Sequence, residues 1–127
     1  MYFTLGRGLV KVPAAARVGT GAWRFRAALD TGSHRTLISR RLAQIMGVGP
    51  ERVLYRSSIM AVGGLLAVDA VRLDWMGTAG VERNTPTVLV YPLAPGLGFE
   101  CLLGLDFLAG HEVWLNLIAG YVDIHPA

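Results

Sequence analysis

The chain has 127 residues, of which 53% are hydrophobic and only 17% charged, below the about 25% charged residues of average soluble domains. This length fits a single domain over residues 1–127, and the excess of apolar residues indicates burial against a second subunit or a membrane. The net charge of +3 comes from arginines scattered along the chain, which argues against nucleic-acid binding, because that function usually needs a basic stripe.

Short apolar runs separated by many of the 16 glycines are typical of an all-β fold. Residues 9–18 predict a strand interrupted at Pro13, and residues 23–29 predict its hairpin partner after a turn at 19–21. Residues 36–46 predict a short helix, with apolar side chains at helical spacing, Ser39 as the N-cap and Gly47 as the end.

The second half of the chain continues the pattern of strands and turns. Residues 53–62 and 65–76 predict a long hairpin around Gly63-Gly64. The further elements expected are a turn at 77–80, a strand at 85–91, a loop at 92–98, a short strand at 100–103, a short helix at 105–109, and a last strand pair at 113–117 and 121–124.

The most informative segment is residues 27–33, Ala-Ala-Leu-Asp-Thr-Gly-Ser. An apolar strand leads directly into Asp30, whose charge is costly to bury unless it is hydrogen-bonded. Thr31 offers a hydroxyl, and Gly32 lets a backbone N–H approach the carboxylate. The combination favours a carboxylate held for catalysis, although the tripeptide taken alone is also typical of a surface turn.

Residues 101–108, Cys-Leu-Leu-Gly-Leu-Asp-Phe-Leu, give the chain a resemblance to a known family. Together with Asp30-Thr31-Gly32 they resemble the retropepsins, retroviral-type aspartic proteases that pair an Asp-Thr/Ser-Gly loop with a later hydrophobic-hydrophobic-Gly strand. The residues after Gly104 look most similar to bacterial members and to the protease domain of DNA-damage-inducible shuttle proteins. The resemblance implies an all-β, closed, barrel-like domain with one or two short helices, working as a two-fold symmetric homodimer.

The resemblance also implies that residues 59–68 form a flap that closes over a peptide. Apolar side chains expected to line the substrate pockets are Leu37, Ile38, Leu66 and Leu103. The substrate contacts that we expect around the catalytic residues are Ser33, Val62, Gly63, Gly64 and Leu103.

Only one Asp-Thr/Ser-Gly motif occurs, because none of the other aspartates precedes Thr-Gly or Ser-Gly. An aspartic protease needs two carboxylates that share a proton, so the second Asp30 is expected from a second copy across a two-fold axis. In the family the motif threonine links the two catalytic loops, which implies that role for Thr31. Residues 121–124 and 2–5 are the terminal strands expected to complete the interface.

The sequence departs from the retroviral pattern next to the motif. Ser33 stands where retroviral enzymes have alanine, and a hydroxyl donated to Asp30 would favour the ionised carboxylate and a more acidic optimum. His34 and Leu105 stand where those enzymes have an acid and an arginine. Arg35 and Asp106 are the candidates for a replacement ion pair.

Other residue classes suggest no cofactor. Cys101 is the only cysteine and is expected to be a small buried hydrophobe. His34, His111 and His125 are not at metal-ligand spacing, so we expect no metal. No apolar run approaches about 18 residues, and residues 1–18 lack a signal-peptide pattern. We expect a cytoplasmic chain, and the alternative is a soluble part of a longer, membrane-anchored protein.

The sequence therefore predicts an aspartic endopeptidase that hydrolyses peptide or protein substrates with a water activated by an Asp30 pair. Thr31 and Gly32 are expected to hold the catalytic residue in place. The alternative is a non-catalytic dimeric peptide-binding or regulatory module with the same fold.

Overall fold

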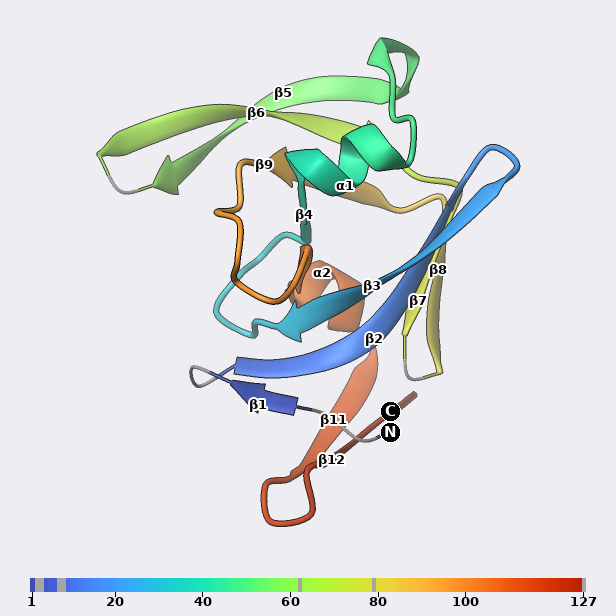
Figure 1. Cartoon of the computed structure of the whole chain (residues 1–127), viewed down its shortest axis with the longest axis vertical. Helices are drawn as coiled ribbons and strands as arrows, with labels where there is room; N and C mark the ends of the chain where they lie inside the picture. Colours follow the sequence, from blue (N-terminus) through green and yellow to red (C-terminus); the bar gives the residue numbers. More distant parts are fainter. Residues whose placement is uncertain (2–3, 7–8, 62, 79, 127) are drawn as a thin grey trace.

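A computed structural model of the chain describes residues 1, 4–6, 9–61, 63–78 and 80–126. Figure 1 shows long curved strands that form a curled sheet, with two short helices beside them and both termini near the last hairpin. The strands are β1 Thr4–Gly6, β2 Leu9–Val18, β3 Gly21–Leu29, β4 Leu37–Ser39, β5 Val53–Ala61, β6 Gly64–Arg72, β7 Trp75–Thr78, β8 Val81–Asn84, β9 Thr87–Tyr91, β10 Cys101–Leu103, β11 His111–Asn116 and β12 Tyr121–Pro126. The helices are α1 Arg40–Ile45, the 3-10 turn η1 Pro50–Arg52 and α2 Leu105–Leu108.

The main sheet runs in the order β5-β6-β9-β4-β10-β3-β2-β7-β8, with β1 added beside β2. The all-β fold class is confirmed. The sheet is a curled half-barrel, since its outer strands β5 and β8 are not neighbours in the described part of the chain. β11 and β12 form a separate two-stranded sheet.

The predicted hairpin at residues 9–29 is confirmed as β2 and β3. Alternate residues of β2 from Val12 to Val18 are buried, which gives the strand one core face. Pro13 does not break β2. It lies opposite Arg26, whose carbonyl points to the other side and accepts a hydrogen bond from the Glu100 N–H.

The prediction of one strand over residues 65–76 is wrong. β6 ends at Arg72, and β7 leaves it to pair with β2 and β8, so residues 77–80 are only partly a turn. Tertiary bonds fix this break: the Asp74 backbone N–H donates to Arg17 O, and its carboxylate pairs with Arg52 at 2.9 Å. The next strand begins at Thr87 rather than at residue 85, because Thr85 has a positive φ of 47°.

The predicted helix is confirmed as α1, and Ser39 caps it by accepting the Leu42 N–H at 2.9 Å. Gly47 follows with φ of 73°, a conformation that suits glycine. The short strand β4 directly before the helix was not predicted. It lies between β9 and β10 and positions the chain that follows the Asp30 loop.

The core lies inside the curl of the sheet and includes Ile38, Leu73, Met76, Leu103 and Phe107. A smaller cluster of Val68, Ala70 and Leu89 lies under the β5–β6 hairpin. At the other end, the amino group and carbonyl of Met1 bond to the backbone of Val122 in β12. No helix among the described residues has the length and hydrophobicity needed to cross a bilayer.

Candidate functional site

Asp30 follows the last residue of β3, where two strands hold the backbone. β10 pairs in parallel with β3, with Leu102 opposite Ala28 and Leu103 opposite Leu29. The Asp30 N–H continues this ladder and donates to Leu103 O at 3.0 Å. The predicted hydrophobic-hydrophobic-Gly strand therefore lies beside the predicted catalytic loop and fixes where Asp30 leaves the sheet.

The loop after Asp30 turns back on the carboxylate. The Gly32 N–H donates to Asp30 Oδ1 at 3.0 Å, and the Ser33 N–H donates to the Asp30 carbonyl at 3.2 Å. A Cβ on Gly32 would lie 3.3 Å from Oδ1, so glycine suits this close approach. Asp30 is half-buried, whereas Thr31 and Gly32 are exposed at the tip of the loop. The carboxylate is thus fixed in orientation while the loop tip is open to a second molecule.

Gly104 is buried against the same loop. An added Cβ would lie 2.6 Å from both the carbonyl carbon and the oxygen of Arg35, and 2.9 Å from Ser33 O. These are backbone atoms, so no side-chain rotation relieves the contact. The Leu105 N–H then donates to Ser33 O at 2.8 Å. Glycine is required here because the two chain segments touch through their backbones.

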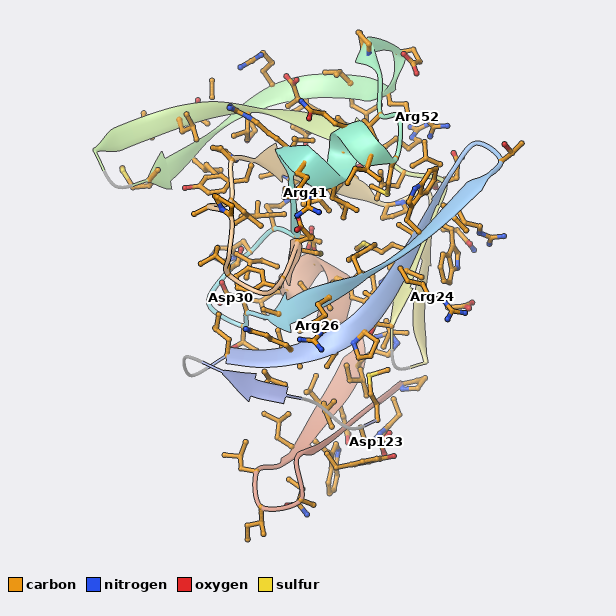
Figure 2. All side chains as sticks on the ribbon, in the orientation of Figure 1. Arg24, Arg26, Asp30, Arg41, Arg52 and Asp123 are labelled. Atoms are coloured by element: carbon orange, nitrogen blue, oxygen red, sulfur yellow. The ribbon has the colours of Figure 1, made fainter. Side chains whose placement is uncertain are left out.

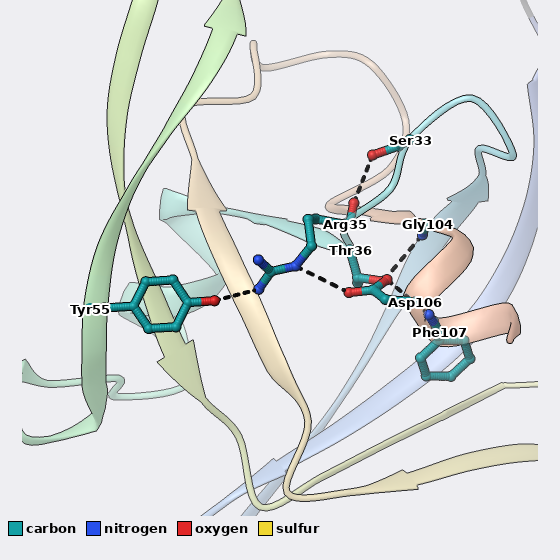
Figure 3. A network of polar contacts seen from close by, with 7 residues as sticks. All are labelled: Ser33, Arg35, Thr36, Tyr55, Gly104, Asp106 and Phe107. Atoms are coloured by element: carbon teal, nitrogen blue, oxygen red, sulfur yellow. Dashed lines mark hydrogen bonds and ion pairs between the residues drawn. The ribbon is translucent and has the colours of Figure 1, made fainter.

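A polar network continues from this contact, as Figure 3 shows. The buried Thr36 hydroxyl accepts the Gly104 N–H at 3.1 Å and donates to Asp106 Oδ1 at 2.7 Å. Asp106 also accepts the Phe107 N–H at 2.8 Å and lies 3.5 Å from Arg35 Nε. The predicted Arg35–Asp106 ion pair is confirmed. The role of Thr36 at the centre of this network was not predicted from the sequence. The one feature that marks it in the sequence is a hydroxyl residue at the start of an apolar segment.

The expectation for Ser33 is corrected by the same network. Its hydroxyl donates to the Arg35 carbonyl at 2.7 Å, and a hydroxyl has a single proton to donate. Ser33 therefore stabilises the turn of its own loop instead of donating to Asp30. The argument for a more acidic optimum, which depended on that donation, no longer holds.

The β5–β6 hairpin is attached to the loop near its base. Arg35 donates to the Tyr55 hydroxyl of β5 at 3.0 Å (Figure 3), and Leu37 packs with Ile59 and Leu66 beneath the hairpin. The contact through Tyr55 was also missed by the sequence analysis, because nothing local marks it. Any movement of the hairpin is therefore linked to the segment that follows Asp30.

The far end of the hairpin has the glycines expected of a tight tip. Gly63 and Gly64 have φ of 94° and 127°, values that disfavour other residues. Val62, expected to contact substrate, lies outside the described residues. Beside the tip, Met60 and Leu65 are opposite each other and are 78% and 72% exposed. Exposed apolar side chains at this point are available to cover a bound chain.

Two expected pocket residues are corrected by their burial. Leu103 and Ile38 are completely buried in the core, so they support the site from behind and do not line it. Leu102, between two buried neighbours of β10, is partly exposed. Because side chains alternate along a strand, Leu102 replaces Leu103 as the residue of β10 on the outer side. Leu37 and Leu66 remain partly exposed.

Among the residues that the structure describes, no acidic side chain is paired with Asp30. Six of the other acids form ion pairs of their own: Asp69, Asp74, Glu100, Asp106, Glu112 and Asp123. In the described part of the chain, no hydrogen bond joins a second carboxyl group to Asp30. A single copy therefore presents one carboxylate at this loop, where a proton-sharing pair needs two.

Cys101, His111 and His125 lie outside the Asp30 loop, whereas His34 is an exposed residue of that loop. Cys101 is fully buried, and burial raises the pKa of its thiol, which agrees with the expected role as a small hydrophobe. His111 contacts a backbone carbonyl, and His125 lies between Glu112 and Asp123. The residues that the structure describes contain no cluster of three His, Cys, Asp or Glu arranged to hold a metal ion.

The β11–β12 hairpin carries several large apolar side chains that are exposed. Ile118 at its turn is fully exposed, and Trp114 and Leu117 are more than half exposed. The turn is ordered, because the Asn116 side chain accepts the backbone N–H groups of Ile118 and Ala119. Of the other segment expected at an interface, residues 2 and 3 lie outside the described residues, and Thr4 and Leu5 belong to β1, paired with β2.

Comparison with known proteins agrees with this geometry. The family model described as Aspartyl protease matches residues 14–107. The chain is similar to a crystal structure titled as a retropepsin-like aspartic protease from Rickettsia conorii, with 18% identity and a TM-score of 0.65 over 98% of this chain and 97% of that one. It is also similar to the solution structure of Simian Foamy Virus (mac) protease, with 19% identity and a TM-score of 0.52 over 77% of this chain and 90% of that one. No curated protein matches. At these identities the similarity establishes a retropepsin-like fold.

Proposed function

Because this chain belongs to the aspartyl protease family, we propose that it is an endopeptidase whose catalytic pair is Asp30 from each of two copies. The observation that carries the proposal is the geometry of Asp30. Its backbone is bonded to Leu103, and its carboxylate accepts the Gly32 N–H at 3.0 Å. A carboxylate fixed at the end of a core strand, with no acidic partner among the described residues of its own chain, supports a catalytic group completed by symmetry.

Two such carboxylates supply both a base and an acid. At close range they do not both ionise, so one keeps a proton. The ionised carboxylate takes a proton from a water, whose oxygen attacks the carbonyl carbon of the scissile peptide. The protonated carboxyl group donates its proton to the carbonyl oxygen, giving a neutral tetrahedral diol. The carboxyl group that gained the proton of the water then gives it to the nitrogen, while the other carboxylate takes a proton from a diol hydroxyl. The C–N bond breaks, and an acid and an amine are released.

The surface of the chain favours a second copy as the partner. Thr31 and Gly32 are exposed beside Asp30, so two loops can meet across an axis and the Thr31 hydroxyl can bond to the opposite loop. The exposed apolar side chains of the β11–β12 hairpin supply surface that association would bury. Near Val122, one edge of β12 pairs with β11 and the other edge is bonded to Met1. Among the described residues, the outer edge of β11 is therefore the edge of this small sheet that a strand of the second copy can join.

The β5–β6 hairpin is the candidate flap in this proposal. Val62, Gly63 and Gly64 form the tip that closes over the substrate backbone, and Met60 and Leu65 lie next to it. Leu37, Leu66 and Leu102 are partly exposed apolar residues near the same region. These side chains favour substrates with apolar residues on both sides of the cleaved bond.

The test is digestion of a mixed peptide library between pH 3 and 7, comparing the protein with its Asp30→Asn variant. Asparagine keeps the size of the side chain and can still accept the Gly32 N–H, but it is a poor base. Cleavage by the wild type and its loss in the variant would support the proposal. Cleavage that persists in the variant would place the chemistry elsewhere. Peptide binding by both proteins without cleavage would favour the non-catalytic module.

A further inference from the structure

Strand β3 has an open edge over its first half. β2 pairs with it from Gly21 to Ala28, whereas β10 joins the opposite side only from Ala27 to Leu29. No strand in the described part of the chain pairs with the remainder of that side. An unpaired strand edge offers backbone donors and acceptors at regular spacing.

The direction of these backbone groups follows from Arg26. Its carbonyl points away from β2, because it accepts the Glu100 N–H at 2.9 Å, and Pro13 opposite it has no N–H to offer. Alternate residues of an antiparallel pair point the same way. The N–H and C=O of Arg24 and Ala22 therefore also point away from β2, toward the open side.

A groove of about 560 Å³ runs along this edge. Trp23 and Phe25 of β3 line it, together with Leu42 and Ile45 of α1 and the loop at residues 93–100. Ile45 is 53% exposed there despite being apolar. The loop is fixed from behind, because Lys11 Nζ donates to the Leu97 carbonyl at 3.0 Å. The volume is within the range of about 300–1,000 Å³ of ligand sites.

Three arginines are among the residues that line the groove. Arg24 and Arg26 come from the exposed face of β3 and Arg41 from α1, as Figure 2 shows. Glu100 is the one acid in the lining, and it is already bonded to Ser39 and Arg41. Neither Arg24 nor Arg26 has an ion pair within the residues that the structure describes. The groove therefore complements an occupant that is both apolar and acidic.

From these features we infer that the open edge of β3 binds an extended acidic segment of another protein as an additional strand. The backbone of the segment bonds to Arg24 and Ala22. Its side chains alternate in direction, so one set contacts Trp23, Phe25 and Ile45 while the other lies near the arginines. The segment recognised has apolar residues alternating with aspartate or glutamate. A small anion or a fatty acid would leave the regularly spaced backbone groups of the edge unpaired.

This site is separate from the proposed catalytic loop. None of the residues lining the groove falls between positions 27 and 38. A protein bound in the groove therefore leaves the Asp30 loop accessible, and the groove would select proteins by a segment distant from the bond that is cut. The inference goes beyond the proposed proteolysis and does not depend on it.

The experiment measures fluorescence anisotropy of a labelled peptide of about six residues, alternating glutamate and leucine, with the full chain carrying Asp30→Asn so that no cleavage occurs. We expect saturable binding of this peptide and no binding of a control peptide that alternates lysine and leucine. Arg24→Glu together with Arg26→Glu should weaken binding about tenfold or more, because two attractions become repulsions. Arg72→Glu is the matched control, since Arg72 is exposed in β6, away from the groove, and should change binding less than about twofold.

Backbone pairing is tested with the same Asp30→Asn chain and two N-methylated peptides. Because only alternate N–H groups of an added strand face β3, methylation of one alternate set should abolish binding, while methylation of the other set should leave it intact. Equal effects of the two sets, or equal effects of the groove arginines and Arg72, would overturn the inference. A change of oligomeric state on Arg24→Pro, followed by sedimentation, would show that a second copy occupies the edge and would also overturn it.

Discussion

Replacement of Thr36 by valine tests whether the polar network holds the Asp30 loop. Valine has the same shape, so no cavity forms, but the hydroxyl is lost. The buried Gly104 N–H loses its acceptor at 3.1 Å, which costs roughly 1–3 kcal/mol. Asp106 loses a donor at 2.7 Å but keeps the Phe107 N–H and Arg35, so this loss adds about 1 kcal/mol. The free energy of unfolding should fall by roughly 2–4 kcal/mol in total.

Urea unfolding followed by tryptophan fluorescence, at one fixed protein concentration, measures this loss. The midpoint should fall with an unchanged slope, and Thr36→Ser, which keeps the hydroxyl, should recover most of the stability. Thr20→Val is the matched control, because Thr20 is exposed in the β2–β3 turn and should tolerate the same change. A Thr36→Val protein within about 0.5 kcal/mol of wild type would refute the reasoning, since a buried N–H would then have lost its acceptor without cost.

Three further predictions concern other parts of the molecule. Gly104→Ala forces a Cβ to 2.6 Å from the backbone of the Asp30 loop, so the free energy of unfolding should fall by about 1–3 kcal/mol or more and the melting temperature should fall with it. Peptide cleavage should be lost even below that melting temperature, and an unchanged melting curve would contradict the contact. The hydrogen bond from Arg52 lowers the pKa of Asp74 in the folded protein. The ionised carboxylate therefore stabilises the folded state at any pH above the ordinary carboxyl pKa, and this stabilisation is lost as the pH falls through the lowered pKa of Asp74. Asp74→Asn should therefore lower the melting temperature near neutral pH, and the difference in melting temperature from the wild type should shrink as the pH falls. A difference that grows toward low pH would contradict this prediction. Ile118→Asp places a charge on the exposed apolar β11–β12 hairpin, so its dimers should dissociate at higher protein concentrations in sedimentation than dimers of the control variant Leu54→Asp. Equal dissociation of the two variants would show that the hairpin is not part of the interface.

The parts of the site that were predictable from the sequence depend on local chemistry. Asp30-Thr31-Gly32 forms its turn through bonds within the tripeptide, and Ser39 caps the helix that begins at the next residue. Gly104 marks a point of backbone contact that other residues cannot occupy. The spacing of these features along the chain also indicated the family that the comparisons established.

The parts that were not predictable depend on contacts between distant segments. The apolar run at residues 65–76 is broken at Asp74, because Arg17, Arg52 and Gly19 from distant segments form hydrogen bonds with this residue. Thr36 acquires its role only when β10 lies beside it. Side chains of β10 point alternately to its two faces, and the sequence does not tell which of these faces the core. Only packing in the folded chain decides that Leu103 faces the core.

The central claim is that two copies of Asp30 make one active site, and mixed dimers test it directly. Wild-type protein at a fixed concentration is refolded with Asp30→Asn protein, and peptide cleavage is measured against the ratio of the two. If the pair lies on a two-fold axis, mixed dimers have one carboxylate and are inactive, so an equal amount of variant should leave about half of the activity and a threefold excess about a quarter. Activity that stays constant at every ratio would show that each chain is catalytic alone and would contradict the account.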